Sequence, residues 1–246
     1  MQAFGPLSTL FRDADRPRGT DAEIAWYLQR VPPGGLCLEL MCGYGRLLAP
    51  LAATGGKFHG VDQSPAMLAR CEEKLAAQGA TAPTFRQDIV QMNLPFRYGC
   101  AFVAGGSFQL ISDAAEVAAA LERIRAHLVD PGMLFIECRI PAEGVQRLGA
   151  PLVEVRTAKL DDGTQIALRS ETTWNADARI MRAQNRYAHR RRAERLAEEH
   201  EKITMTWYPP DEIADIVRAA GFHEVASGPA AANDDEGEAF MLSARA

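Results

Sequence analysis

The feature that most constrains the fold is a short apolar segment followed by two closely spaced glycines. Residues 36–41 read LCLELM, and Gly43 and Gly45 come directly after them. Apolar side chains occupy both alternating sets of positions, which is typical of a strand covered on both faces, as in a parallel sheet. The glycines permit a tight turn and a close approach of the backbone to a ligand. The segment therefore predicts the first buried strand of an α/β domain.

Strands and helices then alternate at the spacing of parallel strands joined by helical crossovers. This alternation predicts a doubly wound, mostly parallel sheet of seven strands. Strands are expected at 36–41, 57–62, 83–88, 100–104, 133–139, 222–227 and 239–244. Helices are expected at 21–30, after the glycine turn as far as about residue 53, from residue 65 onward, at 113–128 and at 211–220.

Between residues 141 and 208 the pattern of polar and apolar residues changes. Polar and apolar residues alternate there in four segments, and residues 161–163 and 175–177 read Asp-Asp-Gly and Asn-Ala-Asp, which are hairpin signals. We expect an antiparallel meander inserted into the core. The predicted division is a core of residues 1–140 and 209–246 with an inserted substrate-cap subdomain of residues 141–208. Residues 1–20 are expected to form a loop.

Charge and cysteine content exclude several classes of partner. The net charge of -5 and the pI near 5.6 disfavour nucleic acid and anionic membranes as partners. Five cysteines without a CxxC pair indicate reduced thiols and no metal site. No apolar run reaches the length of a membrane span, and the first residues lack the pattern of a signal peptide. We therefore expect a cytoplasmic protein.

Candidate ligand-binding residues lie where the predicted parallel strands end, the edge at which open α/β sheets bind ligands. Asp62 and Asp88 end the second and third strands, and Gly105 follows the fourth. A dinucleotide site is one interpretation, but its G-x-G-x-x-G/A pattern has Leu48 at the third small position. Glu39 also suits a ligand with positive charge better than a pyrophosphate. A P-loop is absent from the sequence.

Three motifs in order resemble those of the class I S-adenosylmethionine-dependent methyltransferases. Residues 39–46 (ELMCGYGR) resemble the first motif, residues 60–68 (GVDQSPAML) the second, and residues 86–89 (RQDI) the third. The resemblance covers roughly residues 20–140 and resumes at 209–245. It implies a Rossmann-like core. One departure is Met41, which stands where a third glycine is common and leaves the packing of the loop in question.

The resemblance implies S-adenosyl-L-methionine as cofactor, S-adenosyl-L-homocysteine as product, and no metal. Glu39 would lie near the cofactor's ammonium, Asp62 would hold the ribose hydroxyls, and Asp88 would accept from the adenine amino group. Asp62 and Asp88 are also open to interpretation as helix-cap and turn residues, and Met67 as a core residue. The expected cofactor-binding residues are Glu39, Met41, Gly43, Gly45, Asp62, Gln63, Met67, Asp88, Ile89, Gly105 and Gly106.

Residues after the fourth strand bear on the methyl acceptor. The segment AGGSFQL at 104–110 lacks the D/N-P-P-Y motif of methyltransferases that act on nucleic acid bases. The sequence resembles instead small-molecule methyltransferases with an inserted sheet, such as those acting on amino-sugars, some of which carry a histidine near the position of Gln109. Glutamine orients a substrate but takes no proton at neutral pH. The catalytic candidates are Gln109, Tyr187 and His189, and the substrate candidates are Ser107, Gln109, Tyr187 and Trp207.

Two clusters of arginines admit two interpretations each. Arg190, Arg191 and Arg192 fit a solvated hairpin turn better than a site for an acidic substrate. Arg12, Arg16 and Arg18 belong to an N-terminal arm that we expect to act as a lid over the cofactor.

The leading hypothesis is an N- or O-methyltransferase that acts on a small metabolite, with a homodimer as a further expectation. The absence of an evident general base keeps a second hypothesis open, a non-catalytic S-adenosylmethionine-binding regulatory protein. An NAD(P)-dependent oxidoreductase is a third and is disfavoured by Leu48 and Glu39.

Overall fold

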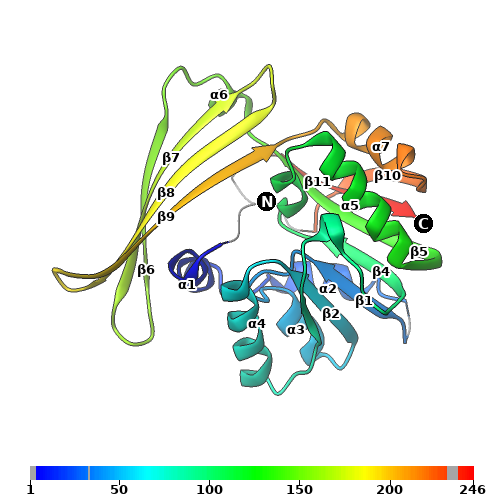
Figure 1. The fold of residues 1–246 in the computed structure, drawn as a ribbon, viewed down its shortest axis with the longest axis horizontal. Helices are drawn as coiled ribbons and strands as arrows, with labels where there is room; N and C mark the ends of the chain where they lie inside the picture. The colour runs from blue at the N-terminus through cyan, green and yellow to red at the C-terminus, as the bar shows by residue number, and fades with distance from the viewer. Residues whose placement is uncertain (1–3, 33, 232–237) are drawn as a thin grey trace.

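The central sheet of the computed structural model has seven strands in the order β10-β11-β5-β4-β1-β2-β3 (Figure 1). Strands β1 to β5 run parallel, whereas β11 is antiparallel to both β5 and β10. The structure describes residues 4–32, 34–231 and 238–246. The strands are β1 (Leu36–Leu40), β2 (Lys57–Asp62), β3 (Thr84–Arg86), β4 (Tyr98–Val103), β5 (Leu128–Ile140), β10 (His223–Pro229) and β11 (Glu238–Arg245).

Helices cover this core sheet on both faces, each face with its own apolar cluster. Side chains of α2, α3 and α4 pack on one face, and those of α5 and α7, with the 3-10 helix η1, pack on the other. The predicted fold class, a mostly parallel doubly wound sheet, is therefore confirmed. The helices are α2 (Asp21–Leu28), α3 (Leu48–Ala53), α4 (Pro65–Ala77), α5 (Ala114–His127) and α7 (Pro210–Ala219), with η1 (Ile89–Gln91) and η2 (Ser107–Leu110).

Polar caps determine where several of these helices begin. Thr20 and Glu23 form a reciprocal capping box at the start of α2. Ser64 accepts from the backbone N–H of Met67 ahead of α4. The helix after the glycine turn begins only at Leu48, so residues 42–47 form an irregular loop and not a first helical turn.

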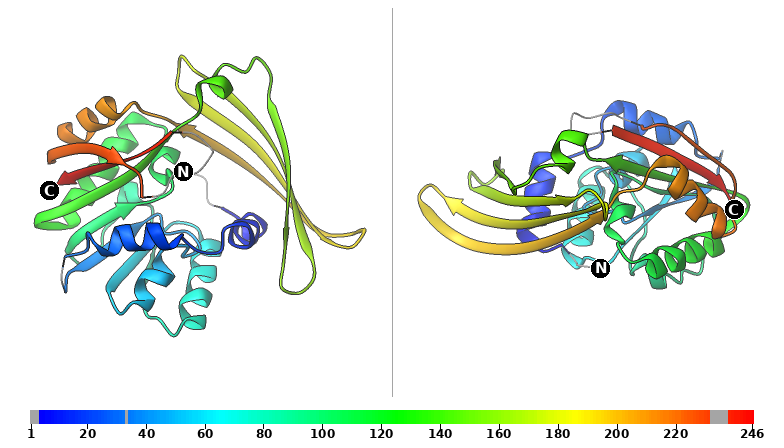
Figure 2. Two further views of the ribbon diagram at one scale, coloured as in Figure 1. Left: turned by 180° about the vertical axis from the view of Figure 1, so that it is seen from behind. Right: turned by 90° about the horizontal axis from the view of Figure 1, so that it is seen from above.

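A second sheet, formed by β6, β7, β8 and β9 in that order, is antiparallel throughout. The predicted meander is therefore confirmed. This second sheet curves away from the core as a separate layer (Figure 2). Its elements are α6 (Glu143–Gln146), β6 (Leu152–Lys159), β7 (Gln165–Asn175), β8 (Ile180–Arg191) and β9 (Glu194–Thr206).

Gln109 joins the two ends of the insertion to the core. Its Nε2 donates to the carbonyl oxygens of Arg139 (2.8 Å), near the end of β5, and of Thr206 (3.1 Å), the last residue of β9. Its Oε1 accepts from the backbone N–H of Arg139 at 2.7 Å. Because Gln109 is 2% exposed, these bonds form out of water and fix where the second sheet leaves and rejoins the core.

The N-terminal segment corrects one prediction, because part of residues 1–20 is helical. Helix α1 spans Pro6–Asp15, with proline in its first turn, where the missing N–H removes no hydrogen bond. The apolar residues of α1 lie three and four apart, and Leu7 and Phe11 pack against the second sheet around Tyr187. The prolines and alternating charges hid this short amphipathic pattern. The expected loop at residues 1–3 lies outside the described residues.

No helix in residues 4–32, 34–231 or 238–246 is long and apolar enough to span a bilayer. The same residues hold no group of three or more side chains suited to a metal ion. All five cysteines are buried free thiols.

Candidate active site

A cavity of about 730 Å³ lies between the carboxyl ends of the core strands, α1 and the concave face of the second sheet. Figures 1 and 2 show α1 placed between the core and the second sheet. The cavity is therefore walled by three parts of the chain that are distant in sequence. The predicted cofactor-binding, substrate and catalytic residues that line it are Glu39, Met41, Gly43, Asp62, Gln63, Met67, Asp88, Ile89, Gly105, Ser107 and Tyr187.

The loop after β1 contains three residues in the left-handed region of φ. Gly43 and Gly45 have φ of 56° and 74°, and Met41 has φ of 54°. A side chain is strained in this region, which explains why glycine is favoured at the position of Met41. Gly45 does not line the cavity. A Cβ there would lie 2.6 Å from Sγ of Cys71, so this glycine lets the loop pack directly on α4.

Asp62 ties the loop to the end of β2. One carboxylate oxygen accepts from the backbone N–H of Gly43 at 2.9 Å, and the other accepts from that of Ser64 at 2.8 Å. Burial raises the pKa of Asp62, and the backbone hydrogen bonds oppose that shift. Asp62 thus acts near a helix start, as one interpretation held, and also faces the cavity with lone pairs left for a ligand.

Glu39 is the most buried carboxyl group of the cavity wall. Its side chain accepts from the backbone N–H of Leu48, while Oε2 has no hydrogen-bond partner among the described residues. Burial raises the pKa of Glu39 to about 8, although Arg46 lowers it. Arg46 itself pairs with Glu23 at 2.8 Å. An unpartnered buried carboxyl oxygen favours a ligand that brings a donor or a positive charge.

Asp88 and its neighbours form the side of the cavity at the ends of β2 and β3. One oxygen of Asp88 accepts from the backbone N–H of Val90 at 3.0 Å and caps η1. Ile89 is 2% exposed, and Met67 is 3% exposed with its sulfur facing the Gly43 turn. The turn role and the ligand-facing position of Asp88 are therefore compatible.

The first of the two glycines after β4 is held by a buried acidic residue that the sequence reasoning missed. Glu137 on β5 accepts from the backbone N–H of Gly105 at 3.0 Å and pairs with Arg139 at 3.2 Å. Gly105 lines the cavity, whereas Gly106 packs against Arg139 and Gln109 beside it. Both glycines have positive φ, 62° and 71°. Glu137 could have been found from its place near the end of a predicted core strand.

Three of the predicted catalytic or substrate residues lie away from the cavity. The side-chain amide of Gln109 forms hydrogen bonds at the junction of the second sheet with the core. His189 pairs through Nε2 with the hydroxyl of Thr164 at 2.7 Å, near the β6–β7 turn. Trp207 is 4% exposed and directly follows β9. None of these three side chains is among the residues that line the cavity.

Tyr187 lines the cavity from β8 within a buried hydrogen-bond network. Its hydroxyl accepts from Arg12 of α1 at 2.7 Å and donates to Glu201 at 3.1 Å. Arg12 also pairs with Glu201 at 3.0 Å. Burial raises the pKa of Tyr187 to about 12, so the phenol remains protonated at neutral pH. Tyr187 thus contributes a protonated hydroxyl group to the cavity wall.

Helix α1 is attached to both the core and the second sheet. Glu199 of β9 accepts from the first backbone N–H groups of α1, those of Leu7 (2.8 Å) and Ser8 (3.1 Å). On the core side, Asp13 pairs with Arg70 and Lys74 of α4. The positive N-terminal end of the α1 dipole favours the carboxylate of Glu199 at the start of the helix. The predicted arm therefore lies along the cavity as a helix with ionic contacts on both sides.

The loop that continues from α1 also closes over the glycine turn. The hydroxyl of Tyr44 donates to the carbonyl oxygen of Arg16 at 2.9 Å, and the ammonium of Lys74 lies 4.8 Å from the centre of the Tyr44 ring. Arg18 pairs with Asp21. Arg12, Arg16 and Arg18 all line the cavity, so the N-terminal arginines belong to its wall.

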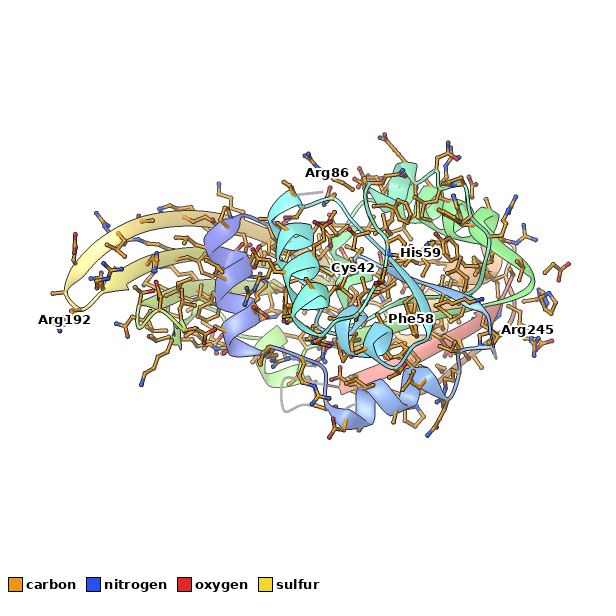
Figure 3. The ribbon with its side chains drawn as sticks, turned by 90° about the horizontal axis from the view of Figure 1, so that it is seen from below. Cys42, Phe58, His59, Arg86, Arg192 and Arg245 are labelled. Atoms are coloured by element: carbon orange, nitrogen blue, oxygen red, sulfur yellow. The ribbon has the colours of Figure 1, made fainter. Side chains whose placement is uncertain are left out.

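The run of arginines at the end of β8 lies outside the cavity. Arg192 is at the tip of the β8–β9 hairpin, at the end of the molecule opposite Arg245 (Figure 3). None of Arg190, Arg191 and Arg192 lines the cavity. This position agrees with a solvated hairpin turn, the interpretation that the sequence favoured.

Comparison with known proteins identifies the core. Residues 37–132 match the family model described as a methyltransferase domain. A protein of Geobacillus sp. (strain WCH70), named as a methyltransferase, is 30% identical over 100 residues, which are 41% of this chain and 40% of that protein. The matched part thus spans less than half the length of this curated relative.

Solved structures are similar over nearly the whole chain. An S-adenosylmethionine-dependent methyltransferase from Clostridium acetobutylicum has a TM-score of 0.76 at 14% identity and covers 95% of each chain. A sugar N-methyltransferase from Streptoalloteichus sp has a TM-score of 0.76 at 23% identity, over 100% of this chain and 94% of that one. An amino pentose methyltransferase from Micromonospora echinaspora has a TM-score of 0.71 at 22% identity, over 100% and 99%. The resemblance inferred from the motifs is confirmed: this chain has the fold of the class I S-adenosylmethionine-dependent methyltransferases.

Proposed function

We propose that this protein transfers a methyl group from S-adenosylmethionine to a nitrogen or oxygen atom of a small metabolite. The observation that carries the proposal is the cavity at the strand ends, which is lined by the glycine turn, Asp62, Asp88 and Glu39, whose Oε2 has no partner among the described residues. The methyltransferase domain match over residues 37–132 supports it.

The cavity-lining residues at the ends of the core strands fit this cofactor chemically. The buried Oε2 of Glu39 lacks a donor, and the ammonium of an amino acid supplies both a donor and a positive charge. Asp62 accepts two backbone N–H groups and keeps lone pairs for the hydroxyls of a ribose. Asp88 has one oxygen on the cap of η1 and would accept from an amino group with the other. Ile89 and Met67 offer apolar surface for a flat ring.

The methyl-transfer step mainly requires that the acceptor atom and the methyl group are aligned. S-adenosylmethionine, when bound, supplies a methyl group on a positively charged sulfur, which is a good leaving group. The wall around Gly105 and Ser107 then orients the acceptor for in-line attack and excludes water. Glu137 holds the backbone N–H of Gly105 and so fixes the shape of this wall.

The acceptor side lacks the usual proton acceptor. No histidine in the described part of the chain lines the cavity, and Tyr187 stays protonated. An amine that is partly neutral in solution, or an acceptor that loses its proton to water, needs no such base. The same observation favours the second candidate, a protein that binds the cofactor without transferring the methyl group.

The oxidoreductase alternative finds little support in the packing of the glycine turn. Leu48 is fully buried, and a Cβ at Gly60 of β2 would lie 2.5 Å from its Cδ2. A large side chain thus fills the contact where a dinucleotide motif has its third small residue. Glu39 also puts a carboxyl group on the side where phosphates would lie.

A transfer assay separates the enzyme from the non-catalytic protein. Purified protein is incubated with S-adenosylmethionine and a panel of small amines and alcohols, and S-adenosylhomocysteine is measured. Formation of S-adenosylhomocysteine that depends on both protein and acceptor supports the proposal. Binding of S-adenosylmethionine without turnover across the panel favours the regulatory protein.

A further inference from the structure

Four polar side chains form a row across the concave face of the second sheet. Glu154 of β6 is in register with Ser170 of β7, Ser170 with Asn185 of β8, and Asn185 with Glu201 of β9. Residues in register on neighbouring strands share one face of a sheet. We call Glu154, Ser170, Asn185 and Glu201 the polar row. Glu154, Ser170 and Asn185 line the cavity, and Glu201 is buried beside them with 4% exposed.

The polar row has hydrogen-bond acceptors that the described residues do not satisfy. Asn185 is 7% exposed, and its Nδ2 donates to Oε2 of Glu201 at 2.9 Å, while its Oδ1 has no partner. Oε1 of Glu201 also has no partner, although Oε2 accepts from Arg12, Asn185 and Tyr187. Buried acceptors are nearly always paired in native structures. An unpartnered oxygen on a cavity-lining residue therefore points to a ligand that donates.

The charged side chains that line the cavity also favour a ligand with a positive charge. The cavity-lining Arg12, Arg46, Arg139 and Arg156 each have a carboxylate partner, respectively Glu201, Glu23, Glu137 and Asp15. Glu154 lines the cavity as a solvent-exposed side chain, and no hydrogen bond or ion pair involves it in residues 4–32, 34–231 and 238–246. The sheet side of the cavity thus offers a negative charge to a ligand and no arginine that lacks a partner.

We propose that the polar row is the part of the site that selects the methyl acceptor, and that it binds a positively charged, hydrogen-bond-donating group such as an ammonium flanked by hydroxyls. Glu154 supplies the opposite charge, and Ser170 Oγ and Asn185 Oδ1 accept hydrogen bonds. Glu201 holds the Asn185 amide and the Arg12 guanidinium, and so acts as a positioning residue. This inference rests on the proposed function, because it assigns the acceptor of that reaction.

The test measures ligand preference in protein loaded with S-adenosylhomocysteine. Loading is first followed by calorimetry, and three cyclitol probes are then titrated to about 10 mM, a range that detects fragment-sized ligands. The probes are 2-deoxystreptamine, which carries two amino groups, neutral myo-inositol, and quinate, which carries a carboxylate. We expect 2-deoxystreptamine to bind at least about tenfold more tightly than quinate, because a charge-assisted hydrogen bond is about twice as strong as a neutral one.

Variants assign the preference to the polar row. Glu154→Gln keeps the size of the side chain and removes its charge, and it should reduce the preference for 2-deoxystreptamine over quinate about five- to tenfold. Glu171→Gln is the matched control. Glu171 faces away from the polar row, since it lies on β7 next to Ser170, and its carboxylate pairs with Arg169. This control should leave the preference unchanged, which excludes a general effect of net charge.

The outcomes separate this inference from the proposed function. Equal binding of the three probes, no binding of any probe to the loaded protein, or an unchanged preference in Glu154→Gln overturns the role of the polar row and leaves the proposed function standing. Failure of S-adenosylhomocysteine to bind at the loading step overturns the proposed function, and the assignment of an acceptor site with it.

Discussion

The two main walls of the cavity are built in different ways. The core wall consists of irregular turns whose backbone is held by buried carboxylates, as Asp62 holds Gly43 and Ser64. The sheet wall consists of side chains that project from a regular antiparallel ladder, as Ser170 and Asn185 do. The backbone of the core wall fixes the shape of the site, so it suits one constant ligand. The sheet wall can change its chemistry by substitution without moving its backbone, so it suits selection of the variable partner.

A substitution in the glycine turn should separate the walls most strongly. Gly45→Ala puts a Cβ 2.6 Å from Sγ and 3.3 Å from Cα of Cys71, at a φ of 74°. We expect a loss of about 2–4 kcal/mol in the free energy of unfolding, from overpacking and backbone strain together, measured by urea denaturation. The control Gly163→Ala lies in a turn of the second sheet at φ 79° with open space around it, and it should cost about 1 kcal/mol. Equal losses would show that Gly45 is not packed against α4.

Removal of a carboxylate tests whether the core wall binds ligand or only caps a turn. Asp62→Ala should weaken S-adenosylmethionine binding by about 1.5–3 kcal/mol, because two backbone donors and the ligand hydroxyls lose their acceptor. Asp113 is the matched control, since its carboxylate accepts from the N–H groups of Ala115 and Glu116 at the start of α5. Asp113→Ala should cost about 1 kcal/mol of stability and leave affinity unchanged. Calorimetry gives both affinities, and an unaltered affinity in Asp62→Ala would remove it from the site.

The same contrast between backbone and side chain explains which residues of the cavity could be predicted from the sequence. Glu39, Asp62 and Asp88 were found because parallel strands of a recognisable period bring their carboxyl ends to one edge. Glu154 and Asn185 were missed because they belong to strands of ordinary alternating polarity, where nothing local distinguishes a cavity-lining polar residue from a solvated one. Gln109 was placed near the acceptor by resemblance, yet its amide joins segments 30 and 97 residues away. Contacts over such separations depend on tertiary packing.

The attachment of α1 to the sheet wall gives a smaller effect. Glu199→Ala removes the acceptor for the backbone N–H groups of Leu7 and Ser8, and so should destabilise the start of α1 by about 1 kcal/mol. Hydrogen exchange of amides in Pro6–Asp15 should then quicken about fivefold. The control Glu198→Ala alters the neighbouring residue, whose carboxylate pairs with Arg186 on the other face of the second sheet, and should leave α1 unchanged. Unchanged exchange in Glu199→Ala would mean that the core alone holds α1.

The buried Glu39 predicts a modest pH dependence of the core wall. Its pKa is raised to about 8, so the carboxyl group is mainly protonated in the free protein at neutral pH. An ammonium ligand favours the ionised form, so affinity should rise with pH between about 6 and 7.5, by at most about tenfold per unit. In the free protein the same group lowers stability as pH rises from about 5 towards 8, because the unfolded chain ionises at lower pH.

The variant Glu39→Gln isolates this contribution. Calorimetry across the pH range should show weaker binding of S-adenosylmethionine and a flatter pH profile than in the wild type, because glutamine does not titrate. A wild-type affinity that is independent of pH, or a variant with the same slope, would place the ligand's ammonium away from Glu39.

The most direct test is a calorimetric titration of the wild-type protein with S-adenosylmethionine, followed by a second titration with NAD. The account predicts saturable binding of S-adenosylmethionine with a dissociation constant in the micromolar range, and much weaker binding of NAD. No heat with S-adenosylmethionine at high micromolar concentration, or tighter binding of NAD, would contradict it.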